Sequence, residues 1–231
     1  KNNILGTQIL AEAAVALGVG EFVLISTDKA VRPTNVMGAT KRAAEKLVQG
    51  LNEVGKTRFI TVRFGNVLDS AGSVVPLFRE QIRAGGPVTV THPEVTRYFM
   101  TIPEACQLIL QAASVGAGGE IFVLDMGEPI LIRYLAEQMI RLSGKRVGRD
   151  IVIDYVGLRP GEKLVEELFL GEEEPMPTPH AKLFLARSAP IDLPAVRNDI
   201  GQLDLAVNNF DEQALHARLR SLVPEFLDDW A

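Results

Sequence analysis

Three adjacent side chains that can handle protons, Thr27, Asp28 and Lys29, follow an apolar stretch with the pattern of a buried β-strand. A hydroxyl, a carboxyl and an amine at one point can supply both the proton donor and the proton acceptor of a reaction. The helix predicted next carries Met37 and Lys41, whose side chains share one face because they are four residues apart. The pattern indicates acid–base chemistry at the end of this strand.

The segments around these residues alternate between helix and strand. Helices are predicted over 4–17 and 35–52, and strands over 21–26 and 58–64. Short buried strands alternating with helices are typical of a parallel sheet covered on both faces. Ligands of such sheets bind beyond the carboxyl ends of the strands. Gly65 and Asn66 follow the second strand as Thr27 follows the first, so both groups lie where chemistry is expected.

The regular alternation of helices and strands ends at about residue 74. Helices are predicted over 74–85, 103–114 and 131–144, with strand-like segments at 87–90, 95–102, 119–127 and 150–158. This mixed portion indicates a smaller α/β lobe. The acidic, proline-rich segment 171–181 is predicted to be a loop, and 193–226 to form two helices with polar faces.

Composition excludes several classes of protein. Hydrophobic residues make up 47% of the 231 residues, enough for a substantial core. The net charge of −5 and the scattered basic residues argue against a nucleic-acid partner, which needs a concentrated basic face. No apolar run reaches the roughly 18 residues of a membrane span, so we expect no membrane contact by this chain itself.

The cysteine and histidine content predicts no metal site. The single cysteine, Cys106, excludes an internal disulfide, and we expect it to be a small buried residue of an apolar helix. The three histidines, His92, His180 and His216, have no metal-ligand spacing.

Four motifs closely resemble the nucleotide-sugar 4,6-dehydratases of the extended short-chain dehydrogenase/reductase superfamily, in the capsule and O-antigen polysaccharide biosynthesis group. They are "TDKAVRPTNVMGATK", "RFGNVL", "VTHPEVTRYFMTIPEA" and "LRPGEKLVEEL". The resemblance covers essentially the whole chain. It implies an α/β fold with the C-terminal part of a Rossmann-like parallel sheet and a smaller mixed substrate-binding lobe.

The glycine fingerprint of dinucleotide binding must follow a strand, whereas "LGVGEF" precedes one. We therefore expect the first half of the Rossmann-like domain to be missing.

The resemblance also implies a division into domains. Residues 1–75 correspond to the C-terminal part of an NAD-binding domain, and 76–190 mainly to a nucleotide-sugar-binding lobe, with some strands and helices returning to the main sheet. Residues 191–231 correspond to a C-terminal helical tail. This polypeptide alone is expected to bind NAD weakly and to have little or no activity.

Met37 occupies the place where most of the superfamily has the tyrosine that serves as acid and base. Methionine cannot exchange a proton, yet it is the usual occupant in the subgroup that this sequence resembles. The resemblance therefore assigns the acid at C6 of the sugar to Asp28 and the base at C5 to Lys29. Thr27 is the hydrogen-bond partner of the C4 oxygen. Lys41 holds the ribose of NAD, and Met37 shapes the catalytic pocket.

Cofactor and substrate contacts are carried over in the same way. Gly65 and Asn66 resemble residues beside the cofactor, and Asn66 also a ligand of the diphosphate or sugar. Arg97 and Arg159 resemble the arginines that grip the nucleotide diphosphate, a task that suits a planar guanidinium. Glu162 resembles a ribose-hydroxyl acceptor.

The resemblance also bears on four other positions. Backbone groups near Val88 and Thr89 resemble the strand that meets the uracil. Asn3 resembles a mainly structural asparagine. Asp69 departs from the family, which has glycine in this turn.

Three functions stay open. The first is a UDP-N-acetylglucosamine 4,6-dehydratase. The second is a 4-epimerase or 4-keto reductase, which needs no acid and base at C5 and C6. The third is a non-catalytic nucleotide-sugar-binding or assembly fragment, favoured by Met37 and the missing fingerprint. For Asp28 and Lys29 themselves, the alternative is a structural surface pair.

The resemblance also carries expectations about partners and location. The partner is a UDP-sugar, and the protein is a homo-oligomer that pairs through the helices near 4–17 and 36–52. It lies on the cytoplasmic side, and segments upstream of Lys1 could anchor it in the inner membrane.

Overall fold

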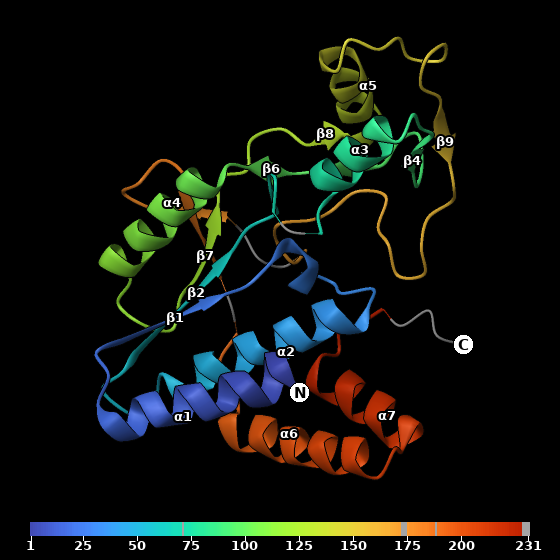
Figure 1. Ribbon diagram of the computed structural model, residues 1–231. Helices are drawn as coiled ribbons and strands as arrows, with labels where there is room; N and C mark the ends of the chain where they lie inside the picture. Colours follow the sequence, from blue (N-terminus) through green and yellow to red (C-terminus); the bar gives the residue numbers. More distant parts are fainter. Residues whose placement is uncertain (71, 172–174, 188, 228–231) are drawn as a thin grey trace. The chain divides into compact units, whose positions relative to one another are not determined.

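The computed structural model describes residues 1–70, 72–171, 175–187 and 189–227 (Figure 1). The chain divides into two compact units. Unit 1 consists of 1–64, 106–125 and 167–231, and unit 2 of 65–105 and 126–166. The domain boundaries predicted above stay a prediction. Part of the predicted tail, 228–231, and part of the predicted acidic loop, 172–174, lie outside the described residues.

Unit 1 contains a five-stranded sheet in the order β1-β2-β7-β11-β10. β1 (Glu21–Ile25), β2 (Arg58–Arg63) and β7 (Ile121–Leu124) are parallel, which confirms the predicted Rossmann-like architecture. β11 (Leu183–Ala186) runs antiparallel to β7 and pairs with β10 (Pro175–Pro177), and β1 lies at the opposite edge. The prediction of a loop throughout 171–181 is therefore wrong, because part of this segment forms β10.

Helices cover both faces of this sheet, as predicted. A π-helical turn (Asn2–Gly6), α1 (Thr7–Leu17) and α2 (Val36–Leu51) lie on one side and α4 (Ile102–Val115) on the other (Figure 1). The alternation of β2 explains this division. Phe59 belongs to the core that includes α2, whereas Ile60 lies so close to the end of α4 that a Cβ on Gly116 would be 2.5 Å from its Cδ1.

The predicted pair of C-terminal helices is present. α6 (Leu193–Asn208) and α7 (Glu212–Leu222) begin at the side-chain caps Asp192 and Asp211. Their buried residues join the core cluster of α1 and α2, so the tail covers part of the surface of α2. The predicted pairing of subunits through α1 and α2 stays a prediction.

Among its described residues, unit 2 contains α3 (Val74–Arg83), α5 (Ile132–Leu142), the first residues of α4 and three two-stranded pairs. β3 (Asn66–Val67) pairs with β6 (Phe99–Met100), β4 (Val88–Val90) with β9 (Ile153–Tyr155), and β5 (Thr96–Arg97) with β8 (Ile130–Leu131). A core of its own, with Phe78, Val88 and Ile140 fully buried, holds these short elements together.

Cys106 is exposed, so the prediction that it is buried is wrong. The buried stripe of α4 runs through Ala105, Leu108 and Ala112, at the spacing of one helix face, and Cys106 lies beside this stripe. An apolar helical neighbourhood did not distinguish the two faces.

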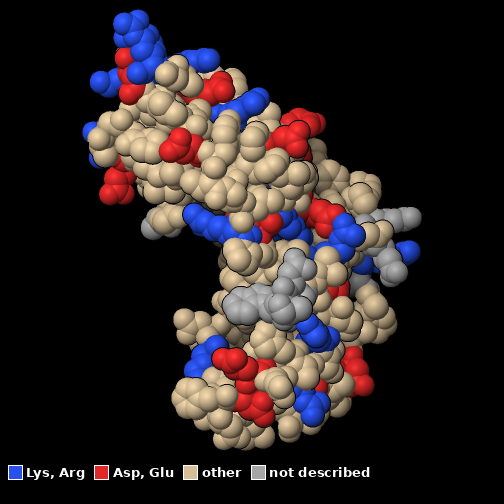
Figure 2. All heavy atoms as spheres, turned by 90° about the vertical axis from the view of Figure 1, so that its right-hand side faces the viewer, with Lys and Arg blue, Asp and Glu red and all other residues tan. Residues whose placement is uncertain are grey.

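Charges of both signs occur across the surface. On the face drawn in Figure 2, Lys and Arg side chains are interspersed with Asp and Glu. Within the described ranges, none of the helices is long and apolar enough to cross a membrane. The same residues contain no group of three or more His, Cys, Asp or Glu side chains that could hold a metal ion.

Candidate active site

The backbone of β1 continues past its last residue into a short 3-10 turn, Asp28–Ala30. Two hydrogen bonds fix the start of this turn against the end of β2, from Ser26 N to Val62 O at 2.8 Å and from Asp28 N to Phe64 O at 3.1 Å. The Thr27 hydroxyl caps the turn by accepting a bond from Lys29 N. The first predicted group thus stands at the carboxyl end of a parallel strand.

The side chains of this turn share one carboxylate oxygen. Asp28 Oδ1 accepts hydrogen bonds from Lys29 Nζ at 3.0 Å and from Thr27 Oγ1 at 2.9 Å. The side chain of Asp28 is 0% exposed and that of Lys29 is 25% exposed. Among the described residues, Asp28 Oδ2 has no hydrogen-bond partner although it is buried. A buried carboxylate with an unused oxygen is the kind of group that functional sites retain.

α2 holds the other two predicted catalytic residues. Asn35 caps the helix through a bond from Gly38 N, and Lys41 Nζ donates to Ile25 O at 3.1 Å. The ammonium of Lys41 therefore lies against the last residue of β1. Met37 is one turn earlier and 44% exposed, so its thioether is accessible.

Close packing joins α2 to the turn. A Cβ on Gly38 would lie 2.1 Å from the Lys29 carbonyl oxygen and 3.0 Å from Pro33 Cβ. Glycine is therefore required for the helix to approach the backbone of the Asp28–Lys29 turn this closely.

We expect Gly38→Ala to lower the free energy of unfolding by at least about 1–3 kcal/mol, the usual cost of overpacking, because the atom it meets is backbone. Gly201→Ala, in α6 with open space around the position, is the matched control and should be neutral or slightly stabilising. Chemical denaturation measures both. Equal stability of the two variants would contradict the close approach.

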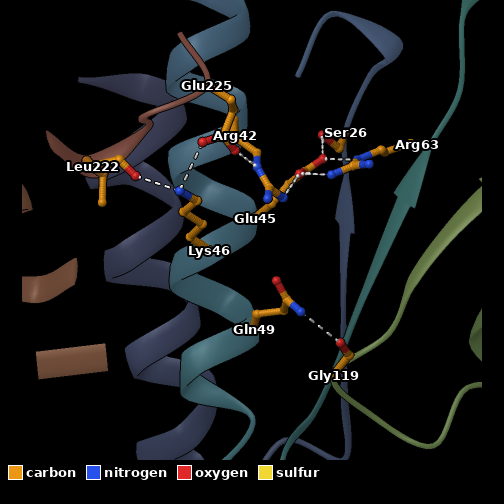
Figure 3. Close-up of polar contacts among 9 residues, drawn as sticks. All are labelled: Ser26, Arg42, Glu45, Lys46, Gln49, Arg63, Gly119, Leu222 and Glu225. Carbon is orange, nitrogen blue, oxygen red and sulfur yellow. Dashed lines mark hydrogen bonds and ion pairs between the residues drawn. The ribbon is translucent and has the colours of Figure 1, made fainter. Parts of the chain in front are cut away.

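A buried ionic network lies behind the turn, and sequence reasoning missed it (Figure 3). Glu45 accepts hydrogen bonds from Ser26 Oγ at 2.6 Å and from Arg63 Nε and Nη2 at 2.8 and 2.7 Å. Arg42 Nη1 donates to Glu45 Oε2 at 2.9 Å. Arg63 and Glu45 are both fully buried. The signal that could have revealed them is an arginine at the end of an otherwise apolar strand, "RFITVR".

Burial alone would raise the pKa of Glu45. The charge and hydrogen bonds of Arg63, the charge of Arg42 and the hydrogen bond from Ser26 outweigh that effect and lower the pKa to about 2. Glu45 is therefore an anion at neutral pH. It projects from α2 and binds Ser26, which follows β1, and Arg63, the last residue of β2.

The second predicted group lies in unit 2, where a cavity of about 450 Å³ opens between its short elements. The predicted residues that line it are Gly65, Asn66, Thr89, Arg97, Arg159 and Glu162. Val88 is instead fully buried in the core of the unit, whereas Val90 and Thr91, which were not predicted, line the cavity. The Val88 side chain therefore does not line the cavity, whereas the adjacent residue Thr89 does.

The guanidinium of Arg97 forms hydrogen bonds with groups of the protein itself. It donates to Glu162 Oε1 at 2.8 Å and to the Thr96 and Leu164 carbonyls at 2.7 and 3.4 Å. Glu162 also accepts bonds from Thr91 Oγ1 at 2.9 Å and from Arg159 N at 3.1 Å. Arg159 itself is exposed, which leaves its guanidinium accessible to an anionic ligand.

Two other predicted positions have local roles. Asn3 Nδ2 donates to Thr40 Oγ1 at 3.0 Å and so ties the N-terminal turn to α2. Asp69 has φ +60, in the left-handed region that favours glycine, and forms an ion pair with Arg79 at 3.0 Å. Glycine adopts this backbone conformation without strain, which fits the expectation of a glycine in this turn.

Comparison with known proteins shows that the chain is similar to proteins of polysaccharide biosynthesis and to a nucleotide-sugar epimerase. The capsular polysaccharide biosynthesis protein CapD of Staphylococcus aureus is 64% identical over 169 residues, which are 73% of this chain and 28% of that protein. The probable polysaccharide biosynthesis protein EpsC of Bacillus subtilis is 50% identical over 95% of this chain and 36% of its own length. A UDP-glucose 4-epimerase of Rickettsia canadensis is 37% identical over 74% of this chain and 50% of its own length. The chain thus spans half or less of these relatives.

Solved structures agree with the fold. Pen from Bacillus thuringiensis superposes with a TM-score of 0.74 at 38% identity, over 83% of this chain and 59% of that one. The dTDP-glucose 4,6-dehydratase of Bacillus anthracis, solved in complex with NAD, has a TM-score of 0.62 at 20% identity, over 69% of this chain and 56% of that one.

The resemblance seen in the four motifs is confirmed by a family model. The model described as "Polysaccharide biosynthesis protein" matches residues 1–188, which include all the predicted site residues. The chain belongs to the polysaccharide biosynthesis protein family.

Proposed function

We propose that the protein containing this chain is an NAD-dependent UDP-N-acetylglucosamine 4,6-dehydratase of bacterial capsule or O-antigen synthesis. The observation that carries the proposal is the buried Asp28 carboxylate with Lys29 Nζ at 3.0 Å and Thr27 Oγ1 at 2.9 Å. Loss of water across C5 and C6 requires an acid and a base close together, whereas epimerisation at C4 does not.

The Asp28–Lys29 contact can generate both catalytic forms at once. Transfer of one proton along the hydrogen bond from Lys29 Nζ to Asp28 Oδ1 would give a neutral amine and a protonated acid. The amine of Lys29 then removes the C5 proton, and Asp28 protonates the C6 hydroxyl, which leaves as water while the C5–C6 double bond forms. Lys29 later returns a proton to C5. The proton that the C4 hydroxyl loses on oxidation would pass through the Thr27 hydroxyl to Asp28, which restores its acid form. The Thr27 hydroxyl bonds the C4 oxygen throughout.

The residues around β1 fit an NAD-dependent reaction. Among the described residues, Lys41 has the single hydrogen bond to Ile25 O, so two of its three N–H donors are available for ribose hydroxyls. Gly65 and Asn66 are the other proposed cofactor contacts. Bound NAD would accept the C4 hydride and return it to C6, and Met37 would shape the pocket without exchanging protons.

The nucleotide diphosphate is assigned to the cavity of unit 2, with Arg159 as its accessible cation and Glu162 as the ribose acceptor. Arg97 would support this site mainly by fixing Glu162, to which it is bonded. Backbone groups near Thr89 would face the uracil.

Arg159→Ala is expected to raise the KM for the UDP-sugar about 10- to 100-fold, the loss of one charge-assisted contact, with a smaller change in kcat. Steady-state kinetics on the full-length protein measure this. Arg149→Ala, an exposed arginine of the same unit outside the cavity lining, is the control. An unchanged KM in Arg159→Ala would contradict the diphosphate assignment.

Incubation of the full-length protein with UDP-N-acetylglucosamine in D₂O tests the reaction itself. We expect a 4-keto-6-deoxy product carrying deuterium at C5, detected by NMR, because Lys29 exchanges its protons with solvent. The 37% identity to a UDP-glucose 4-epimerase makes epimerisation the second candidate, and it would give a C4 epimer without deuterium at C5. Binding without turnover would indicate the non-catalytic alternative.

Assembly and location belong to the same proposal. The exposed apolar residues Ile9, Leu10 and Leu17 of α1 support pairing of two copies through the N-terminal helices. A cytoplasmic catalytic domain, anchored to the inner membrane by segments upstream of this chain, fits a role in polysaccharide synthesis.

A further inference from the structure

The segment that follows α7 contacts the helix and loop that hold the candidate active site. Lys46 Nζ donates to Leu222 O at 2.9 Å and to Glu225 Oε2 at 3.3 Å, and Arg42 Nε donates to Glu225 Oε1 at 2.6 Å. Leu227 N donates to Pro33 O at 2.8 Å. Residues 222–227, here called the brace, thus contact both α2 and the loop between the Asp28–Lys29 turn and α2.

These contacts are shielded from solvent. The side chains of Arg42, Lys46 and Glu225 are 8%, 15% and 20% exposed, respectively. Exposed ion pairs contribute little to structure, whereas pairs with this degree of burial fix geometry because an unpaired buried charge is costly. The ion pairs of the brace are therefore largely shielded, and Leu222, Val223 and Phe226 are buried, whereas Pro224 and Leu227 are exposed.

The brace is connected to the strand end by a continuous chain of side chains (Figure 3). Arg42 donates to Glu225 with Nε and to Glu45 with Nη1, and Glu45 accepts the Ser26 hydroxyl. Ser26 is adjacent to Thr27 in the sequence, and Lys41 is adjacent to Arg42. Glu225 thus acts, through one arginine and one glutamate, on both sides of the candidate site.

Glu225 balances part of the positive charge of the buried network. Three cations, Arg42, Lys46 and Arg63, share two anions, Glu45 and Glu225. Without the charge of Glu225, Lys46 would lose the anion that it contacts here, and Arg42 would keep only Glu45 among the anions that the described residues offer it. Arg42 would then be held between the tail and Glu45 by a neutral acceptor, which binds a guanidinium more weakly than a carboxylate does.

We propose that residues 222–227 form an intramolecular brace of the active site, with Glu225 as a positioning residue that holds α2 and the Thr27–Lys29 turn in register. This role rests on the proposed dehydratase function. The brace lies beyond residue 188, where the family match ends, so it is a feature of the tail and not of the matched region.

Glu225→Gln in the full-length protein tests the brace. It keeps the shape of the side chain and removes its charge. We expect kcat for dehydration to fall about 10- to 100-fold, the effect of misplacing catalytic groups by roughly 1 Å, with KM for the UDP-sugar within about twofold of wild type. Hydrogen–deuterium exchange of peptides covering residues 26–31 should become faster, because this turn loses its support.

Asp199→Asn is the matched control. Asp199 pairs with Arg218 and Ser221 of α7, and neither bond involves α2 or Glu225, so kcat and exchange of residues 26–31 should stay as in wild type. Circular dichroism establishes that each variant is folded at the assay temperature. If Glu225→Gln does not fold, Lys46→Gln, which removes two bonds to the brace, is measured in the same way.

The outcomes separate the brace from the proposed function. An unchanged kcat in Glu225→Gln, unchanged exchange of residues 26–31, or an equal loss in Asp199→Asn would overturn the brace. If wild type makes no 4-keto-6-deoxy product, the dehydratase proposal fails, and the exchange measurement alone then decides whether the brace supports the turn.

Discussion

Asp28→Asn is expected to lower the rate of dehydration about 10²- to 10⁴-fold, the usual contribution of a positioned general acid. The amide keeps the shape of the side chain and can still accept the bonds that Lys29 and Thr27 donate to Oδ1, but it cannot protonate a leaving hydroxyl. It also removes the partner to which Lys29 can pass its proton. Both the acid and the neutral base are therefore lost in one substitution.

Product formation followed by NMR measures this effect, and calorimetry should show that the affinity for the UDP-sugar is retained, because the proposed diphosphate contacts lie in unit 2. Asp154→Asn, an exposed carboxylate of β9 outside the cavity lining, is the matched control. Turnover of Asp28→Asn within twofold of wild type would show that another group supplies the proton at C6.

Glu45→Ala is expected to lower the free energy of unfolding by about 3–5 kcal/mol, because it leaves the fully buried Arg63 without its carboxylate. Glu21→Ala removes an exposed ion pair with Arg58 and should cost about 1 kcal/mol or less. Chemical denaturation at pH 7 compares the two. A loss in Glu45→Ala no larger than in the control would show that the network contributes little to stability.

The pH dependence of this loss has a definite sign. The pKa of Glu45 is about 2 in the folded protein against 4.5 for the free side chain, so its contribution is complete above about pH 4.5 and is lost as the pH falls toward 2. The stability gap between wild type and Glu45→Ala should therefore shrink from pH 5 to pH 3. A constant gap would contradict the depressed pKa.

Local signals were sufficient to predict most elements of this fold. α2 begins after the capping residue Asn35 and α1 ends at Gly18, whose φ of 65 suits glycine, so both boundaries followed from side-chain chemistry. β10 and β11 could not be predicted in this way. β10 consists of Pro175, Met176 and Pro177, a composition that disfavours strands. It forms by pairing with β11, which in turn pairs with β7, and such pairing does not show in the local sequence.

The candidate site was predictable only in part, because some of its contacts join residues that lie far apart in the sequence. Motifs indicated Asp28, Lys29 and the arginines, because their spacing is fixed along the chain. The pairing of Glu45 with Arg63 joins a helix to a strand 18 residues away, and a glutamate in a helix ordinarily indicates a solvated face. Likewise, the binding of Arg97 to Glu162 depends on a contact 65 residues apart.

The position of β1 at the edge of its sheet has a consequence for how this chain behaves. Among the described residues, β1 pairs with β2 along one side, so the N–H and C=O groups of its other side remain a template for an added strand. Phe22, Val23 and Leu24 make that template apolar. An extended segment that adds there would complete the hydrogen bonding of β1, and in its absence the same groups favour self-association of the polypeptide.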